Sequence, residues 1–360
     1  MSEYPPLPES AAPLLTAIVP ARNEARNIER CVRSILASEY PDLEVVAVDD
    51  HSTDGTGEIL ERLALEDARL RVVGGQELPD GWFGKPWACW QGYRAARGSL
   101  LLFTDADTAH GPALHAHAVA LLFAEGAQLV TVMPRQELLT FWERVVQPHF
   151  FLLLGIRYGS PERLNRNADP RHAIANGQFI LVTRESYEAL GGHGRVHGQV
   201  VEDLALAQEY AGAGRRLFFA VADQHMTTRM YTSLREIVDG WTKNTFVGMR
   251  RMARSRFGQY VWLVAALGVP LLWILPLGLL GWGVAERGAA LAAFGAVSAA
   301  GSLATMAMLL RLMKAPPLYA PLYPLGALVT AFILLRAAAR GTRKIEWKGR
   351  TYSSGAVVST

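Results

Sequence analysis

Short runs of apolar, often β-branched residues recur along the first part of the chain, and polar turns separate them. They occupy residues 14–19, 43–48, 70–73, 100–104 and 129–133. Runs of this length and composition are typical of buried strands. Between them, apolar residues recur at helical spacing, as in Ile28, Val32 and Ile35. This alternation predicts an α/β fold: a mostly parallel, Rossmann-like sheet with helices on both faces.

The pattern changes sharply after residue 259. Three long apolar stretches follow, at residues 260–284, 289–312 and 318–335. Each is about as long as a membrane span requires. The only charged residues in this region are Glu286, Arg287, Arg311 and Lys314. We therefore expect about three transmembrane helices over residues 256–337, and the alternative of buried helices in a soluble domain is disfavoured.

Basic residues flank these stretches, and basic loops usually stay on the cytoplasmic side. They are Arg250, Arg251, Arg254 and Arg256 before the first stretch, and Arg311 and Lys314 before the third. The tail, residues 338–360, is also basic, yet three complete spans would place it outside. One stretch could therefore be re-entrant or interfacial, and the prolines near the third make it the weakest. Residues 1–13 are expected to be disordered and lack a signal-peptide pattern, which predicts a cytoplasmic domain over residues 14–255.

Composition excludes some classes of function. The chain has 36 Lys and Arg against 33 Asp and Glu, a net charge of +3. No strongly basic field therefore indicates a nucleic-acid partner. The two cysteines, Cys31 and Cys89, lie far apart without metal-type spacing, which fits reduced thiols in a cytosolic domain.

Carboxylates follow two of the predicted strands, at the edge where open α/β sheets bind ligands. Asp50 ends the run 43–48 and could accept hydrogen bonds from a base or ribose; the alternative is an ordinary polar turn that caps a helix. Asp105 and Asp107 follow the run 100–104. Two carboxylates at this spacing suit a divalent cation that also binds phosphate oxygens, with helix capping again the alternative.

Two further features could add a base and a cation. Glu202 and Asp203 precede a helical pattern, where a carboxylate near a metal could act as general base on an acceptor hydroxyl. Helix capping by Asp203 is equally good locally. Lys85 opens the predicted helix that bears Trp87, where it could pair with a diphosphate or remain a solvated surface lysine.

Taken in order, five motifs resemble those of the family 2 glycosyltransferases of GT-A fold. They are residues 18–24 (IVPARNE), residues 48–56 (VDDHSTDGT), Gly84-Lys85, Asp105-Ala106-Asp107 and Glu202-Asp203. The resemblance covers residues 14–241 and implies a GT-A domain over residues 14–255. It also implies a hexosyltransferase that uses a nucleotide-sugar, most plausibly a UDP-sugar, together with Mg²⁺ or Mn²⁺, and that inverts the anomeric centre.

The resemblance further implies a role for each matching position. The residues that would line the nucleoside pocket are Pro20, Ala21, Glu24 and Asp50. The other implied roles are Lys85 near the nucleotide, Asp105 near the ribose or sugar, Asp107 on the metal and Asp203 as the catalytic base. The family's usual Gln-x-x-Arg-Trp motif is absent. Trp241 would stand for its tryptophan, and Lys243, Arg229 or Arg235 would supply its cation.

Downstream segments are similar to bacterial glycosyltransferases associated with carotenoid and hopanoid pathways. They include Ala175-Asn176-Gly177-Gln178, Gly191-Gly192-His193 and Gly240-Trp241-Thr242-Lys243-Asn244. This similarity implies a lipid or isoprenoid acceptor and a multi-pass enzyme of the inner membrane. The apolar run 145–156 could lie in the interface and help the acceptor reach Asp203, or it could be a buried core helix. The alternatives are a processive polysaccharide synthase, disfavoured by the missing motif and few spans, and a non-catalytic nucleotide-sugar-binding scaffold, disfavoured by the intact acidic set.

Overall fold

The computed structural model describes residues 1, 3–167, 169–252, 256–340, 344–347 and 350–353. The chain divides into two compact units. The first comprises Met1–Gln136, Ser160–Arg229 and Lys344–Thr360, and the second comprises Glu137–Gly159 and Met230–Arg343. We predicted a single boundary near residue 255. The structure differs because two segments within 14–255 pack with the apolar helices of the second unit.

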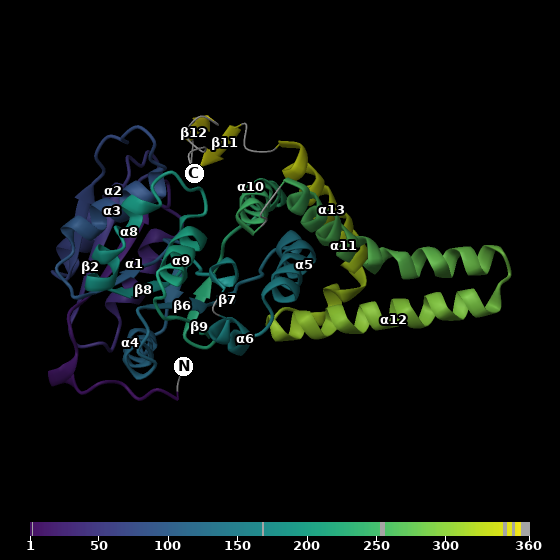
Figure 1. Ribbon diagram of the computed structural model, residues 1–360, viewed down its shortest axis with the longest axis horizontal. Coiled ribbons are helices and arrows are strands. Elements are labelled where there is room, and N and C mark those ends of the chain that lie inside the picture. Colours follow the sequence, from purple (N-terminus) through teal and green to yellow (C-terminus); the bar gives the residue numbers. More distant parts are fainter. Residues whose placement is uncertain (2, 168, 253–255, 341–343, 348–349, 354–360) are drawn as a thin grey trace. The chain divides into compact units, whose positions relative to one another are not determined.

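A seven-stranded sheet forms the centre of the first unit, in the order β3-β2-β1-β4-β8-β6-β9 (Figure 1). Its strands are β1 (Leu15–Ala21), β2 (Leu43–Asp49), β3 (Leu70–Gly74), β4 (Leu100–Phe103), β6 (Leu129–Met133), β8 (Ile180–Thr183) and β9 (Leu217–Val221). Every neighbouring pair is parallel except the two that β8 makes with β4 and β6. The mostly parallel α/β architecture is therefore confirmed, with each predicted strand present.

Helices cover both faces of this sheet because successive side chains of a strand point to opposite sides. Ala17, Val45 and Leu102 pack on the side of α1 (Ile28–Leu36), α2 (Thr56–Glu66) and α4 (Leu114–Ala124). Ile18 and Leu101 pack on the side of α3 (Gly84–Ala95), α7 (Arg184–Ala189) and α9 (Glu202–Gly212). Burial on both faces explains why the strands read as continuous apolar runs.

A second sheet lies beside the end of β4. Its strands run in the order β5-β10-β7, with β5 (Thr108–His110), β10 (Met226–Thr228) and β7 (Arg135–Gln136). β10 is antiparallel to β5, and their pairing sets Thr228 opposite Thr108. The same unit contains the short helices α6 (Pro161–Arg166) and α8 (Gly192–Arg195). This small sheet fixes the backbone directly after the Asp105 and Asp107 turn.

The N-terminal segment is ordered along residues 3–13, in contrast to the predicted disorder. Tyr4 donates its hydroxyl proton to Glu125 Oε1 at 2.8 Å. Leu7 packs against the buried core of the first unit, and a 3₁₀ turn covers Glu9–Ala11. A few apolar side chains in this polar, proline-rich segment are sufficient to hold it against the sheet domain.

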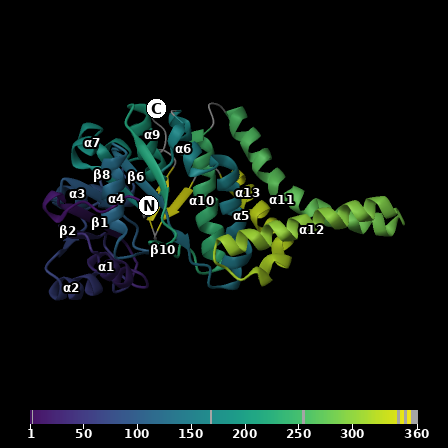
Figure 2. The same cartoon turned by 90° about the horizontal axis from the view of Figure 1, so that it is seen from below.

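The second unit is helical. Its elements are α5 (Phe141–Tyr158), α10 (Leu234–Met252), α11 (Arg256–Ala285), α12 (Ala289–Leu312), the 3₁₀ helix η3 (Pro317–Leu322) and α13 (Tyr323–Arg340). α11 and α12 run side by side as a hairpin in both views (Figures 1 and 2). Glycine permits this close packing, because a Cβ on Gly295 would lie only 2.4 Å from the backbone nitrogen of Leu280.

Three segments of this unit are long and apolar enough to cross a membrane: Leu263–Ala285, Ala289–Leu312 and Pro317–Ala339. These segments match the three apolar stretches predicted from the sequence. The third segment differs from the other two in burial. In its most apolar stretch 44% is buried, compared with 11% in the first segment and 17% in the second. It also begins as the 3₁₀ helix η3, where prolines cannot donate the backbone hydrogen bonds of an α-helix.

The run 145–156 is largely a core segment of α5. Val145, Val146 and Phe150 are buried together with Ile333 and Leu334 of α13. Towards the end of α5, Ile156 is 59% exposed. The buried-helix alternative therefore describes the first part of this run. At the end of the chain, β11 (Lys344–Trp347) and β12 (Arg350–Ser353) form an antiparallel pair, and the rest of the predicted basic tail beyond residue 340 lies outside the described residues.

Candidate active site

The ends of β1 and β2 are joined beside Asp50. Asp50 is 1% exposed, and its backbone N–H donates to the carbonyl oxygen of Ala21 at 2.8 Å. The following loop is held by Asp54, which accepts hydrogen bonds from Thr56 Oγ1 at 2.6 Å and from the backbone N–H of Ala25 at 3.0 Å. Asp54 therefore has a structural role in the Asp50 loop.

The four residues predicted to line the nucleoside pocket lie on these two joined strand ends. They are Pro20 and Ala21 at the end of β1, Glu24 in the next loop, and Asp50 after β2. The backbone N–H of Glu24 donates to Thr56 Oγ1 at 2.8 Å, which links the two loops. Burial raises the pKa of Asp105, and the negative charges of Glu202 and then Glu24 add to the rise, so Glu24 is electrostatically connected to the β4 end. Nucleoside binding by these four residues remains a prediction.

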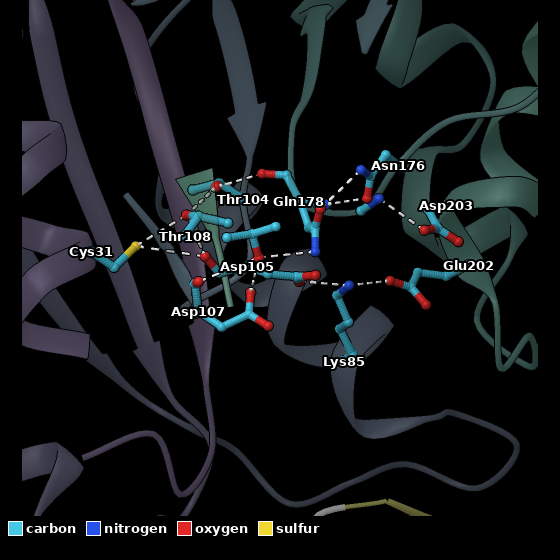
Figure 3. A network of polar contacts seen from close by, with 12 residues as sticks. Cys31, Lys85, Thr104, Asp105, Asp107, Thr108, Asn176, Gln178, Glu202 and Asp203 are labelled. Carbon is cyan, nitrogen blue, oxygen red and sulfur yellow. Dashed lines mark hydrogen bonds and ion pairs between the residues drawn. The ribbon is translucent and has the colours of Figure 1, made fainter. Parts of the chain in front are cut away.

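Lys85 joins two carboxylates from distant parts of the chain (Figure 3). Its Nζ lies 2.6 Å from Asp105 Oδ1 and 2.7 Å from Glu202 Oε1. The first turn of α3 presents Lys85, the end of β4 presents Asp105, and the start of α9 presents Glu202. Lys85 is thus not a free surface lysine, because two carboxylates pair with it. Its predicted place near the nucleotide remains a prediction.

Asp203 lies against the same backbone turn as Lys85. Its Oδ2 accepts a hydrogen bond from the backbone N–H of Gly177 at 2.8 Å, and its Oδ1 accepts one from Leu204 at 2.7 Å. A Cβ placed on Gly177 would lie 2.7 Å from Lys85 Nζ and 3.0 Å from Asp203 Oδ2. The absence of a side chain at position 177 therefore allows these two groups to meet the turn.

Electrostatics distinguishes the acidic groups of this cluster. Burial raises the pKa of Asp203 to about 6, and the negative charge of Glu202 adds to the rise, while Lys85 opposes it. Burial acts to raise the pKa of Glu202 too, but the charge of Lys85 outweighs it and holds that pKa low. Burial acts to lower the pKa of Lys85, whereas Asp105 and Glu202 hold it well above its usual value. Asp203 is thus a carboxyl that can exchange a proton close to neutral pH, and burial raises the pKa of Asp105 as well.

Asp107 is linked to this cluster through buried polar side chains (Figure 3). Thr228 Oγ1 lies 3.4 Å from Asp107 Oδ1, and it accepts a hydrogen bond from Gln178 Nε2 at 3.0 Å. Thr108 Oγ1 donates to the carbonyl oxygen of Asp105 at 2.8 Å and so fixes the turn between the two aspartates. The structure thus brings Lys85, Asp105, Asp107 and Asp203 into one network.

The donors in this network are compatible with a hard divalent cation. Asp105 and Asp107 offer carboxylate oxygens, which Mg²⁺ and Mn²⁺ prefer over nitrogen or sulfur ligands. Across the described part of the chain, no three His, Cys, Asp or Glu side chains are grouped so as to hold a metal. A cation bound here would therefore complete its shell with water and substrate phosphate, as Mg²⁺ commonly does.

Trp241 and Lys243 lie on α10, in the second unit. The Trp241 ring stacks on Phe150 with a centroid separation of 4.3 Å and an interplanar angle of 6°. Its Nε1 is buried and has no hydrogen-bond partner among the described residues. Trp241 is thus part of the apolar core of its own unit, and the predicted contacts of Trp241 and Lys243 with the donor remain a prediction.

Comparison with known proteins relates residues 16–191 to a known family. Residues 16–191 match the model of the family described as "Glycosyl transferase family 2". These residues carry a family 2 glycosyltransferase domain. Among curated proteins, the chain is similar to the 4,4'-diaponeurosporenoate glycosyltransferases of Staphylococcus aureus strains USA300 and MRSA252. Each is 29% identical over 241 residues, which cover 65% of this chain and 61% of the relative, so the match spans less than two thirds of their length.

A solved structure supports the fold of the glycosyltransferase domain. A mannosyltransferase from Pyrobaculum calidifontis, in complex with GDP-Man and Mn²⁺, superposes with a TM-score of 0.56. It is 22% identical in sequence, and the alignment covers 92% of this chain and 88% of that one. The likeness shows that the GT-A fold predicted from the sequence motifs is correct.

The sequence did not assign individual roles to three residues that lie at the centre of this network. Glu202 pairs with Lys85, and Gln178 and Thr228 connect the network to Asp107. Glu202 stands next to the predicted base, and Gln178 lies in the 175–178 motif, so both positions carried a signal. Thr228 carried none, because its role depends on the pairing of β10 with β5.

Substitution of Gly177 tests the close packing of the turn on Lys85 and Asp203. We expect Gly177→Ala to lower sugar transfer about 100-fold, because displacing reacting groups by about 1 Å has effects of this size. Gly212→Ala is the matched control, since a Cβ there meets nothing within 4 Å at the end of α9. Its activity should equal that of the wild type. Equal activity of both variants would contradict the described packing at Gly177.

Proposed function

We propose that the protein is a membrane-bound inverting glycosyltransferase that moves a sugar from a nucleotide-sugar, a UDP-sugar in the first instance, to a lipid acceptor. The observation that carries this proposal is the meeting of Lys85, Asp105, Glu202 and Asp203 at the carboxyl edge of the sheet. The names of the Staphylococcus relatives support an isoprenoid acceptor of the carotenoid class.

In this proposal the donor binds across the ends of β1, β2 and β4. Asp50 and the segment with Pro20, Ala21 and Glu24 line the nucleoside side. Asp107, with Asp105 beside it, would hold Mg²⁺ or Mn²⁺. Such a cation would balance the negative charge that develops on the departing diphosphate. Lys85 keeps Asp105 in place through their 2.6 Å ion pair.

Asp203 acts as the general base. Its carboxylate takes the proton from the acceptor hydroxyl while the acceptor oxygen attacks the anomeric carbon and the nucleoside diphosphate departs with the bonding electrons. One displacement of this kind inverts the anomeric centre, and no bond to the protein forms. Each oxygen of Asp203 accepts one backbone hydrogen bond and keeps a second lone pair for this proton.

The raised pKa of Asp203 suits a hydroxyl acceptor. An alcohol must lose a proton during the attack, and a base whose pKa lies near the working pH is effective at removing it. A carboxylic acid is already ionised at neutral pH and needs no such base. The name of the Staphylococcus relatives denotes a carboxylate. The proposal therefore includes both a hydroxyl acceptor, for which Asp203 is the base, and a carboxylate acceptor, which would react without help from Asp203.

The apolar helices supply the membrane attachment in this proposal. Leu263–Ala285 and Ala289–Leu312 are the two segments with the least burial, and they would cross the bilayer as a hairpin. The basic residues near the ends of these segments favour a cytoplasmic position for the glycosyltransferase domain. An enzyme at the inner membrane would meet soluble nucleotide-sugars and membrane-embedded lipids at the same surface.

Sugar transfer by the purified full-length chain tests the proposal. The protein in detergent would be incubated with Mn²⁺, a panel of radiolabelled UDP- and GDP-sugars, and either an isoprenoid alcohol or an isoprenoid acid. We expect one of the donors to yield a radiolabelled lipid. The sugar in that product should have the inverted anomeric configuration. Donor hydrolysis or nucleotide binding without any lipid product, across both acceptor types, would contradict the proposed function.

The pH dependence of kcat/KM should report the ionisation of Asp203. A base works only when it is deprotonated, so activity should fall as the pH drops below the pKa of Asp203, which is about 6. We expect kcat/KM for a hydroxyl acceptor to rise between pH 5 and pH 7 and then level off. With a carboxylate acceptor this rise should be absent, which separates the two acceptor classes in a single set of measurements.

A further inference from the structure

A turn at residues 176–178, just before β8, contacts Asp203 directly and is connected to Asp107 through Thr228 (Figure 3). The backbone N–H of Gly177 donates to Asp203 Oδ2 at 2.8 Å. The next residue, Gln178, donates from Nε2 to Thr228 Oγ1 at 3.0 Å. The Thr228 hydroxyl in turn lies 3.4 Å from both Oδ1 and the carbonyl oxygen of Asp107, so it shares its proton between two acceptors of one residue.

The backbone N–H of Gln178 fixes the direction of each hydrogen bond in this series, from Asn176 to Asp107. The N–H of Gln178 donates to Asn176 Oδ1 at 3.2 Å, so the Asn176 amide must present Nδ2 on its other side. Asn176 Nδ2 therefore donates to Gln178 Oε1 at 2.9 Å. Gln178 is left with Nε2 as its donor towards Thr228. Because Thr228 accepts that bond, its own proton is directed to Asp107.

Burial holds Gln178 and Thr228 in place, whereas the last link, from Thr228 to Asp107, is longer at 3.4 Å. Gln178 is 4% exposed and Thr228 is fully buried. The main chain of Gln178 is held as well, since its carbonyl oxygen accepts a hydrogen bond from Thr104 Oγ1 at 2.7 Å at the end of β4. A buried amide that lost these partners would pay for its desolvation without compensation, so the bonded arrangement is strongly preferred.

We infer that Gln178 is a positioning residue: through Thr228 it orients the Asp107 carboxylate towards a divalent cation, while its own turn holds Asp203. The inference rests on the proposed function for the roles of Asp107 and Asp203. Groups that hydrogen-bond to metal-binding carboxylates fix their orientation, and substitution of such groups typically lowers metal affinity about 10- to 100-fold. Gln178 needs no contact with substrate to act in this way.

Mn²⁺ binding by the full-length chain tests the inference without relying on turnover. Electron paramagnetic resonance of free Mn²⁺, with UDP or GDP present, gives the affinity directly. We expect Gln178→Met and Thr228→Val, which keep the side-chain volume, each to weaken Mn²⁺ binding about 10-fold. The double variant should be no weaker than the more affected single variant, because both substitutions break one chain of hydrogen bonds.

Gln91→Met is the matched control. Gln91 is a buried glutamine of α3 whose Oε1 accepts from the backbone N–H of Gln76 at 2.7 Å, outside the network of Gln178. Its substitution should alter thermal stability but leave Mn²⁺ affinity unchanged. If Gln178→Met does not fold, Thr228→Val reports on the same connection.

The outcomes separate the inference from the proposed function. Unchanged Mn²⁺ affinity in Gln178→Met and Thr228→Val would overturn the inference, as would fully additive losses in the double variant. A wild-type protein that binds no Mn²⁺ with either nucleotide would overturn it too. Binding of Mn²⁺ without any sugar transfer would contradict the proposed function alone, because the affinity comparison would still decide the role of Gln178.

Discussion

Asp203→Asn is expected to lower kcat for a hydroxyl acceptor about 1,000-fold, since general base catalysis typically contributes 100- to 10,000-fold. Asparagine keeps the size of the side chain but cannot take the proton of the acceptor. Mn²⁺ and nucleotide binding should remain, because neither requires proton removal. Initial rates at saturating donor, with the pure variant in detergent, measure the effect. The pH dependence near 6 should also disappear from the residual activity.

Glu209→Gln is the control for this experiment. Glu209 lies on α9, as Asp203 does, but it forms an exposed ion pair with Arg195 at 3.3 Å. Its substitution should leave turnover unchanged, since exposed ion pairs contribute little. Near-normal turnover of Asp203→Asn with an alcohol would show that another group removes the proton. If Asp203→Asn kept near-normal turnover only with a carboxylic acid acceptor, the result would agree with the proposed chemistry, because that acceptor needs no base.

The sheet could be predicted from the sequence because its strands are buried on both faces. The runs at residues 14–19 and 43–48 are apolar except for Thr16 and Glu44, and they correspond to β1 and β2 with bounds within one or two residues. β8 and β9 were not predicted. The local signal for β8 was present, because Ile180–Thr183 is as short as β4 and nearly as buried. β9 carried a weaker signal, since it includes the exposed Val221 and two half-buried residues.

The site could be predicted only in part, because several of its contacts join residues that are far apart in the sequence. Asp105, Asp107 and Asp203 stand in recognisable local motifs, whereas the partners of Lys85 depend on which helix and strand ends meet in space. Thr228 contacts Asp107 from 121 positions away. The division into units also could not be read from local pattern, because Phe150 and Trp241 pack together across a long separation in the sequence. Long-range pairing of this kind leaves no periodic signal.

Lys85→Met should have the largest effect on stability of any single substitution in the network. Removing one partner of a buried ion pair typically costs about 3–5 kcal/mol. The Lys85 side chain is 21% exposed, so solvent reduces the expected loss to about 2 kcal/mol. For a unit of this size, that loss corresponds to a decrease in Tm of about 4–8 °C. Thermal unfolding of the full-length protein in detergent provides the measurement.

The direction of the pH effect identifies the cause of this loss. Without the ammonium group, Asp105 and Glu202 lose their common partner, and their pKa values rise as buried carboxyls without a cation. Protonation at low pH removes their repulsion, so the deficit of Lys85→Met relative to the wild type should be smaller at pH 5 than at pH 8. A deficit that stayed constant with pH would indicate lost packing of the lysine side chain.

A second substitution separates stability from activity. Lys85→Met combined with Glu202→Gln removes one negative charge together with the cation, so it should recover most of the lost Tm. Sugar transfer should nevertheless stay about 100-fold below the wild type, because Asp105 still lacks the partner that holds it at the end of β4. Recovery of both stability and turnover in the double variant would mean that Lys85 only neutralises Glu202. Recovery of stability without turnover would show that the ammonium group of Lys85 positions Asp105 for the reaction, in addition to balancing its charge.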